Sequence, residues 1–211
     1  MKPEFWHRRW REGRIAFHQP RANPHLVEHW PLIGAEPDSA VLVPLAGKSL
    51  DLLWLAEAGH EVIGVELSPI AVRDFFSEND LEPQPADCGP LSGWRAGPVH
   101  LLEGDFHHVE RERLPAITAV YDRAALVALP PEMRPAYVEK LAGLLEANGE
   151  VLLISLEFPP GEREGPPFPI GPDEIHDLFD PLFVVEQLAS TPAAGPSDQT
   201  REVVYRMRRR P

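Results

Sequence analysis

The sequence contains a single cysteine, Cys88, so no disulfide can form within the chain. A lone cysteine also excludes a zinc site built on several thiolates, and it is typical of proteins from a reducing compartment. No apolar run approaches the roughly 18 residues that a membrane-spanning helix requires. The N-terminal segment MKPEFWHRRWREG lacks the apolar stretch of a secretory signal peptide. We therefore expect a soluble, cytoplasmic protein without a membrane partner.

Basic residues are also scarce. The chain has 20 Lys and Arg against 33 Asp and Glu, which gives a formal net charge of -13. Proteins that bind nucleic acids hold the phosphates with clustered Lys and Arg, so this balance argues against a nucleic-acid partner. The one basic cluster lies at the C-terminus, where we interpret it as a solvated tail; it consists of Arg206, Arg208, Arg209 and Arg210.

Two phosphate-binding motifs are incomplete at the turn Pro44-Leu45-Ala46-Gly47-Lys48. A dinucleotide-binding turn requires G-x-G-x-x-G, so that the backbone can approach a pyrophosphate, and only one glycine is present here. The tripeptide Gly47-Lys48-Ser49 matches the end of a Walker A loop, but the first glycine of that motif would fall on Leu42. The sequence therefore excludes a Walker A loop and disfavours a dinucleotide.

Motifs for hydrolytic metals and for nucleophilic serine are missing as well. His60-Glu61 lacks the second histidine of H-E-x-x-H, and no serine lies within G-x-S-x-G. His107 and His108 are adjacent, so their side chains diverge on regular structure. We expect no metal site.

The sequence between residues 40 and 66 predicts a strand, a turn, a helix and a second strand. The run Val41–Leu45 is apolar throughout, as a parallel strand covered on both faces should be. Ser49 is placed to cap the following helix, and Gly59 is placed to end it. The second strand, 62–66, ends on an acid.

Glu66 at the end of that strand predicts the kind of ligand. Ligands of doubly wound sheets bind at the carboxyl ends of the strands. A carboxylate there can accept hydrogen bonds from both hydroxyls of a ribose. Because the turn at Leu45 is poor in glycine, a cofactor with ribose and adenine but no phosphate fits best, which points to S-adenosylmethionine.

The rest of the chain predicts one α/β domain over residues 1–211. Residues 1–35 are expected to form a helical lid over a doubly wound, mostly parallel sheet spanning 36–211, with a loop at 158–172 that covers the substrate. We expect residues 79–97 to be irregular and Gly149 to close a helix that begins at Pro130-Pro131. The expected seven strands lie at 41–45, 62–66, 99–102, 117–121, 151–156, 183–188 and 203–207.

Polar residues recur at the ends of two further strands. Asp105 could accept from an adenine amino group, and Phe106 could pack against the adenine ring. Arg123 follows Asp122 at the end of the fourth strand. Each residue alone could be structural, but the carboxyl ends of parallel strands meet at one edge of the sheet. The recurrence therefore favours a binding site.

Several segments together resemble the bacterial branch of the thiopurine S-methyltransferase family. They cover nearly the whole chain and are unusual enough in sequence that chance agreement is improbable. The family has the seven-stranded, Rossmann-like fold of class I S-adenosylmethionine-dependent methyltransferases with an N-terminal helical cover. The segments are Trp6-His7-Arg8-Arg9-Trp10, GRIAFHQ at 13–19, VLVPLAGKSLDLLWLAEAGHEVIGVELS at 41–68, YDRAALVAL at 121–129 and GPPFPIGPDEIHDLF at 165–179.

The resemblance implies roles for individual residues. Phe17 matches a phenylalanine that contacts the substrate, and Arg123 matches an arginine near both cofactor and substrate, where it would orient the acceptor. Ala46 departs from the family, which often has cysteine there; because that turn acts mostly through its backbone, binding should survive. The residues implied to bind the cofactor are Trp10, Leu45, Glu66, Asp105, Phe106 and Arg123.

The function that the resemblance implies is methyl transfer from S-adenosylmethionine to sulfur. The acceptor would be a small molecule: a thiol, a thiopurine, or a selenium or tellurium compound such as tellurite. We expect the enzyme to be a monomer. Two alternatives remain open, namely a non-catalytic domain that binds an adenosine cofactor and a nicotinamide-dependent reductase on a related sheet.

Overall fold

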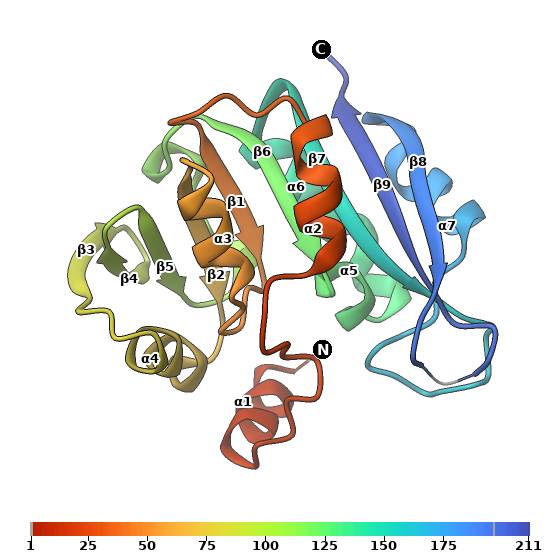
Figure 1. The fold of residues 1–211 in the computed structure, drawn as a ribbon, viewed down its shortest axis with the longest axis horizontal. Coiled ribbons are helices and arrows are strands. Elements are labelled where there is room, and N and C mark those ends of the chain that lie inside the picture. Colours follow the sequence, from red (N-terminus) through yellow and green to blue (C-terminus); the bar gives the residue numbers. More distant parts are fainter. Residues whose placement is uncertain (1, 196) are drawn as a thin grey trace.

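The computed structural model describes residues 2–195 and 197–211. The chain forms a twisted nine-stranded sheet with helices on both faces (Figure 1). Strands β5, β2, β1, β6 and β7 run parallel, and the outer strands pair antiparallel to their neighbours. In spatial order the strands are β3 (Gln84–Cys88), β4 (Leu91–Ala96), β5 (Val99–Glu103), β2 (Glu61–Glu66), β1 (Ala40–Pro44), β6 (Ile117–Arg123), β7 (Leu145–Glu157), β9 (Arg201–Arg209) and β8 (Phe183–Pro192).

All seven strands expected from the sequence are present, and the structure adds the hairpin β3–β4 at the β5 edge. The expectation that residues 79–97 are irregular was therefore wrong. Proline and glycine obscured the pattern, because Pro85 lies in β3 and Gly93 in β4. An edge strand tolerates proline. A glycine is needed at 93, since a Cβ there would lie 2.5 Å from the carbonyl oxygen of Ala86.

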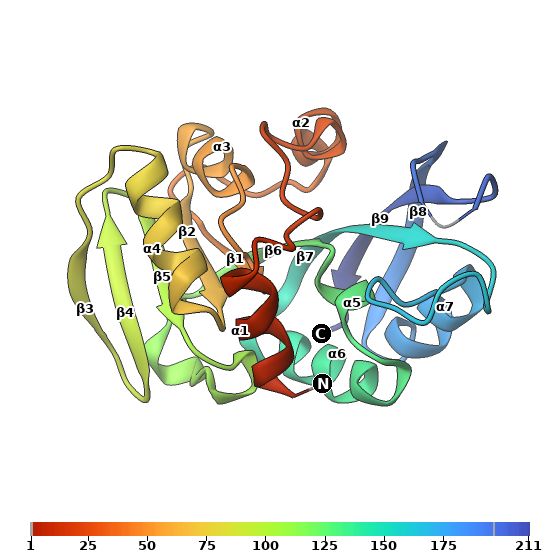
Figure 2. The ribbon, with the colours of Figure 1, turned by 90° about the horizontal axis from the view of Figure 1, so that it is seen from below.

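The helices divide between the two faces of the sheet, as Figure 2 shows. Leu26, Leu52 and Phe75 bring α2, α3 and α4 into one hydrophobic cluster. A second cluster on the opposite face joins α5, α6 and α7 to the sheet. The helices are α1 (Pro3–Arg11), α2 (Pro24–His29), α3 (Asp51–Glu57), α4 (Pro69–Glu78), α5 (Ala125–Ala128), α6 (Arg134–Leu144) and α7 (Pro172–Phe179), with 3-10 turns at η1 (Trp30–Leu32), η2 (Phe106–His108), η3 (Arg111–Arg113) and η4 (Pro131–Met133).

The helix ends differ from the sequence expectation at two places. Ser49 does not cap α3 directly, because the helix begins at Asp51, whose N–H donates to the Ser49 hydroxyl at 3.2 Å. Gly149 does not close α6, which ends at Leu144. Strand β7 begins at the next residue and already includes Gly149.

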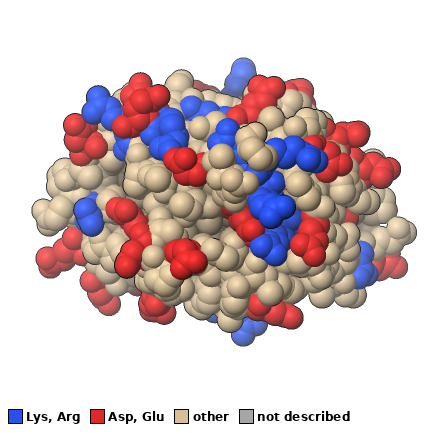
Figure 3. All heavy atoms as spheres, turned by 90° about the horizontal axis from the view of Figure 1, so that it is seen from above, with Lys and Arg blue, Asp and Glu red and all other residues tan. Residues whose placement is uncertain are grey.

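The carboxyl ends of the parallel strands define one edge of the molecule, and α1 lies across that edge (Figures 1 and 2). The opposite edge faces the viewer in Figure 3, where acidic and basic side chains are interspersed. Within the described residues, no helix is long and apolar enough to span a bilayer. Ligands of doubly wound sheets bind at the carboxyl ends of the strands, so a ligand site is expected at the edge beneath α1.

Candidate active site

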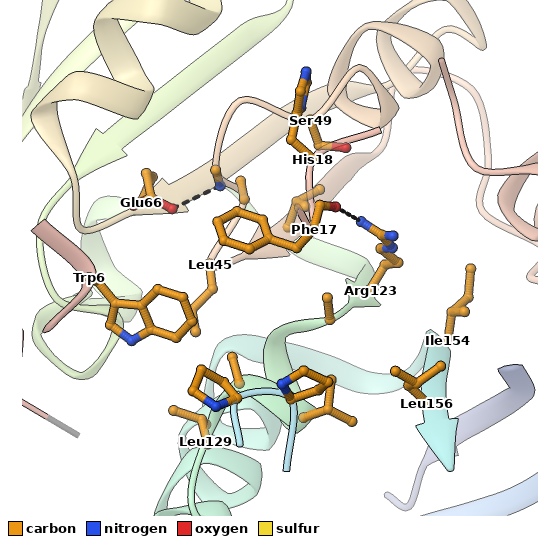
Figure 4. A pocket seen from close by; sticks show the side chains of 18 of the residues that line it. Trp6, Phe17, His18, Leu45, Ser49, Glu66, Arg123, Leu129, Ile154 and Leu156 are labelled. Carbon is orange, nitrogen blue, oxygen red and sulfur yellow. Dashed lines mark hydrogen bonds between the residues drawn. The ribbon is translucent and has the colours of Figure 1, made fainter. Parts of the chain in front are cut away.

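A cavity of about 630 Å³ opens at the carboxyl ends of the parallel strands. A volume of this size is typical of sites for small molecules and cofactors. Its walls come from α1 and the following loop, the ends of β1, β2, β5 and β6, and the segment between β7 and α7 (Figure 4). All residues predicted to bind cofactor or substrate line it: Trp10, Phe17, Leu45, Glu66, Asp105, Phe106 and Arg123.

The turn after β1 adopts a left-handed backbone at two positions. Leu45 has a φ of 48° and Gly47 a φ of 58°, and the Ala46 N–H donates to the Val65 carbonyl at 2.9 Å. Trp10 packs directly over this turn, because a Cβ on Gly47 would lie 3.4 Å from the indole Cζ2. The left-handed conformation at Leu45 is unfavourable for a residue with a side chain, and such strain is often kept at binding sites.

Glu66 lies at the end of β2 and is only 6 % exposed. Its Oε2 accepts from the Gly47 N–H at 2.8 Å, and its Oε1 accepts from the Ser68 N–H at 2.7 Å. Burial raises the pKa of this carboxyl to about 7, although the hydrogen bonds from Ser68, Gly47 and Leu67 act in the opposite direction. Each oxygen keeps a lone pair that could accept from a hydroxyl group.

Asp105 and Phe106 follow β5 at the same edge. The Asp105 Oδ1 accepts from the His107 N–H at 2.9 Å, so this carboxylate caps η2 as well as lining the cavity. The Phe106 ring lies 5.2 Å from the ring of Tyr137 and is almost fully buried. Both residues therefore have structural roles, and contact with an adenine remains a prediction.

Arg123 ends β6 and points into the cavity (Figure 4). Its Nη1 donates to the carbonyl oxygen of Phe17 at 2.7 Å. No ion pair recorded between the described residues includes this arginine. The Arg123 guanidinium is therefore a cation at the cavity wall. No carboxylate of the described residues forms an ion pair with it.

The neighbouring Asp122 faces the core. Its Oδ1 accepts from the N–H groups of Ala125 and Leu126 at 3.2 and 3.4 Å, which ties the start of α5 to β6. Its Oδ2 accepts from the Tyr137 hydroxyl at 2.6 Å. Burial raises the pKa of Asp122 to about 6. Asp122 thus holds the strand end in place, while Arg123 on the other side of the strand faces the ligand space.

Three aromatic side chains from the first 17 residues gather over the cavity. The Phe17 ring lies edge-on to Trp6 and Trp10, at centroid separations of 6.0 and 5.7 Å. Within this aromatic group, the Trp10 side chain is almost fully buried. The N-terminal segment therefore places an apolar layer above the turn at Leu45; that this layer covers a cofactor stays a prediction.

The cavity wall also includes a polar network that was not predicted from the sequence. The Tyr121 hydroxyl donates to Asp51 Oδ2 at 2.9 Å, and Asp51 Oδ1 accepts from the Asn23 N–H at 2.7 Å. Both Tyr121 and Asp51 line the cavity. Tyr121 could have been found, because it lies two positions before Arg123 and so shares its face of the strand. Nothing in the sequence singles out Asp51.

A buried arginine at the start of α6, which the sequence did not indicate, holds the loop at 158–172. Arg134 donates from Nε to the Leu129 carbonyl and from Nη2 to the Pro169 carbonyl, each at 3.1 Å. Its Nη1 pairs with Glu174 at 2.5 Å. These contacts fix the second half of the loop, whose Pro166 and Pro167 line the cavity.

His107 and His108 lie in η2 and form no metal-ligand cluster with other described residues. One group of potential ligands, His25, Glu28 and His29 of α2, does lie close together in the described part of the chain. None of these three residues lines the cavity.

Solved structures share this architecture. A 1,6-didemethyltoxoflavin-N1-methyltransferase from Burkholderia thailandensis aligns with a TM-score of 0.68 at 16 % identity, covering 99 % of this chain and 87 % of that one. A TehB-like, S-adenosylmethionine-dependent methyltransferase from Corynebacterium glutamicum aligns with a TM-score of 0.57 at 14 % identity, covering 96 % of each chain. At these identities the match shows the fold, which is the Rossmann-like methyltransferase fold with an N-terminal helix.

Sequence comparison shows the family. The family model described as thiopurine S-methyltransferase matches residues 1–210. A thiopurine S-methyltransferase from Pseudomonas fluorescens is 43 % identical over 216 residues, covering 99 % of each chain. One from Xanthomonas axonopodis pv. citri is 41 % identical over 218 residues, covering both chains in full. The chain therefore belongs to the thiopurine S-methyltransferase family of S-adenosylmethionine-dependent methyltransferases.

Proposed function

We propose that this enzyme transfers the methyl group of S-adenosylmethionine to the sulfur of a small thiol or thiopurine, or to selenium or tellurium in a compound such as tellurite. The supporting observation is that every residue predicted for cofactor or acceptor lines one cavity, although these residues come from five separate segments. The named activity of the relatives points to sulfur as the accepting atom. The acceptor is thus a small molecule that fits beside the cofactor.

The donor end of the cavity suits an adenosine group. In the proposed complex, Glu66 accepts from the ribose hydroxyls, because its oxygens keep free lone pairs after the bonds to Gly47 and Ser68. Asp105 accepts from the adenine amino group, and Phe106 packs on the ring. Trp10 covers the cofactor where it crosses the turn at Leu45. The buried carboxylate and the close approach at Gly47 support this assignment.

When bound, S-adenosylmethionine supplies a methyl carbon on a positively charged sulfur, which a thiolate, thione or selenium lone pair can attack in line. Such nucleophiles react at neutral pH, so the chain needs no strong general base. Its contribution is alignment, which can supply several kcal/mol of the barrier. Phe17 and Arg123 are proposed to contact the acceptor, with Arg123 orienting it through hydrogen bonds.

Exclusion of water is the second contribution. Charge is neutralised when an anionic nucleophile attacks a sulfonium, so a dry, apolar site favours the reaction. The acceptor side of the cavity is apolar (Figure 4); it is lined by Leu129, Ile154, Leu156, Pro166 and Pro167. We propose that residues 1–35 act as a lid on the sheet domain of 36–211 and that the loop at 158–172 covers the acceptor.

Two experiments test this function against the alternatives. S-adenosylhomocysteine should raise the melting temperature and NADH should not, because only a ligand that binds the native state stabilises it. Stabilisation by NADH alone would favour a reductase. A panel of aromatic thiols, thiopurines, selenite and tellurite should then yield methylated products. Stabilisation by S-adenosylhomocysteine with no product from any acceptor would favour the non-catalytic domain.

The net charge of -13 supports a protein without a nucleic-acid partner. We further infer a monomer that acts in the cytoplasm without a membrane partner. Light scattering of the purified protein should give a mass near the 23.6 kDa of one chain, and a mass of twice this value would contradict the monomer.

A further inference from the structure

Arg9 of α1 is a cation that faces the cavity without an anionic partner. Its Nε is buried and has no hydrogen-bond partner, and its guanidinium carbon lies 5.6 Å from the centre of the Phe5 ring. Arg9 lines the cavity and forms no ion pair with another described residue. The Arg9 guanidinium is therefore a cationic group at the cavity wall that no carboxylate of the described residues neutralises directly.

Arg163 reaches the same cavity from the loop at 158–172. Arg163 is exposed and, like Arg9, forms no ion pair with another described residue. Burial and the nearby positive charges of Arg14 and Arg163 lower the pKa of Arg9. Arg14 differs from the other two, because it pairs with Glu12 at 2.6 Å and does not line the cavity.

These two arginines come from the two segments that cover the cavity, α1 and the loop. Like charges that face one space repel each other, and an anion between them removes that repulsion. Arg123, a third arginine of the cavity wall, already donates a hydrogen bond to the Phe17 carbonyl oxygen at 2.7 Å. Arg9 and Arg163 form no ion pair with another described residue and are therefore available to an anionic group.

We propose that Arg9 and Arg163 form an anion subsite for the methyl acceptor. The preferred acceptor is then a small aromatic thiol that carries a carboxylate in addition to its nucleophilic sulfur. Bidentate contacts between guanidinium and carboxylate groups would hold the ring in one orientation. This inference rests on the proposed methyl transfer to sulfur, and it adds the charge of the acceptor and the residues that recognise it.

The test compares two acceptors that differ in charge but hardly in shape, 4-mercaptobenzoate and 4-mercaptobenzamide. Initial rates are measured with the full-length protein at saturating S-adenosylmethionine. The variants are Arg9→Gln and Arg163→Gln, with Arg14→Gln as the matched control from the same lid. Binding of S-adenosylhomocysteine is measured for each variant by calorimetry.

The wild-type enzyme should prefer the carboxylate by about tenfold in kcat/KM, mainly through KM, as a charge-assisted contact predicts. Arg9→Gln should remove most of this preference and change the rate on the amide less than about twofold, because only the charged contact is lost. Arg163→Gln should have a smaller effect in the same direction, since the side chain is exposed. Arg14→Gln should leave the preference intact.

Equal kcat/KM values for the two acceptors in the wild-type enzyme would overturn the subsite. An equal loss on both acceptors in Arg9→Gln would also overturn it. If S-adenosylhomocysteine binding weakened in parallel, Arg9 would belong to the cofactor carboxylate and the subsite would be wrong. Failure of the proposed function looks different, because neither thiol would then be methylated by the wild-type enzyme. Should Arg9→Gln fail to fold, the exposed Arg163→Gln carries the same comparison.

Discussion

Arg123 and Phe17 are joined by a hydrogen bond of 2.7 Å between the guanidinium Nη1 and the backbone carbonyl oxygen, across 106 positions of the sequence. This bond connects the end of β6 to the loop that follows α1. Because the acceptor is a backbone atom, the Phe17 ring stays free to pack against Trp6 and Trp10. One arginine therefore links the proposed acceptor site to the position of the lid.

Arg123→Lys should separate the orientation of the acceptor from cofactor binding. Lysine keeps the positive charge but loses the planar fork that can hold Phe17 and an acceptor together. Activity should fall by one to two orders of magnitude, roughly 1.4–2.7 kcal/mol of barrier. The affinity for S-adenosylhomocysteine, measured by calorimetry, should change much less. A parallel loss of cofactor affinity would assign Arg123 to the donor side alone.

Cofactor affinity should depend on pH through Glu66. In the folded protein without ligand, burial raises the pKa of the Glu66 carboxyl to about 7. Ribose hydroxyls donate to it and so favour the ionised form, which means that protonation below pH 7 opposes binding. Affinity for S-adenosylhomocysteine should fall by up to about tenfold per pH unit below 7.

Glu66→Gln is the matched control for this pH dependence, because it keeps the shape but cannot ionise. Its affinity at pH 8 should be lower by roughly 1.5–3 kcal/mol, and it should vary less with pH. Calorimetry at pH 6 and 8 measures both effects. Parallel pH profiles for the two proteins would exclude Glu66 as the titrating group.

The proposed N-terminal lid should become more ordered when the cofactor is present. Amide exchange of residues 5–18 should slow on addition of S-adenosylhomocysteine, because Trp10 would then pack against a ligand as well as against the turn at Gly47. Phe17→Ala removes the ring contacts and leaves the carbonyl bonded to Arg123, so it should reduce this protection. If the ligand leaves the amide exchange of residues 5–18 unchanged, α1 is a static part of the hydrophobic core and not a lid.

Tyr137→Phe should destabilise the protein more at high pH than at low pH. The Tyr137 hydroxyl favours ionised Asp122, so its loss raises the folded-state pKa of that carboxyl further above its present value of about 6 and above the ordinary 3.8. A raised folded pKa means that stability is lost as pH increases through it. Urea unfolding should show a loss of about 1.5–3 kcal/mol at pH 8 and a smaller loss at pH 5. Equal losses would contradict the assignment.

Local sequence was sufficient to place the proposed donor half of the site in one cavity. The apolar strand, the glycine-poor turn and the acid at Glu66 are consecutive in the chain, so spacing alone placed them at one strand edge. Asn23 before Pro24 is likewise a local signal for a helix start, and its side chain caps α2 by accepting from the His25 N–H at 2.8 Å. The position of Phe17 came from family resemblance, and the structure places it next to Arg123.

What the sequence could not reveal depends on distant partners. From the sequence, Asp51 is indistinguishable from other acidic residues in the first turn of a helix. Its hydrogen bond to Tyr121, which lies 70 positions away, shows its place in the cavity wall. Arg134 reads as a surface residue, yet it is fully buried and holds the loop through Pro169. Strand β3 lacks alternating apolar residues because it is the edge strand of the sheet and none of its residues is buried.

The most direct test of the central claim is mass spectrometry of the product formed from thiophenol and S-adenosylmethionine with a deuterated methyl group. The enzyme should form thioanisole that carries the intact labelled methyl group, with one S-adenosylhomocysteine released per product. At limiting cofactor, Glu66→Gln should form it more slowly. The absence of labelled thioanisole, under conditions in which the protein demonstrably binds S-adenosylhomocysteine, would contradict methyl transfer to sulfur.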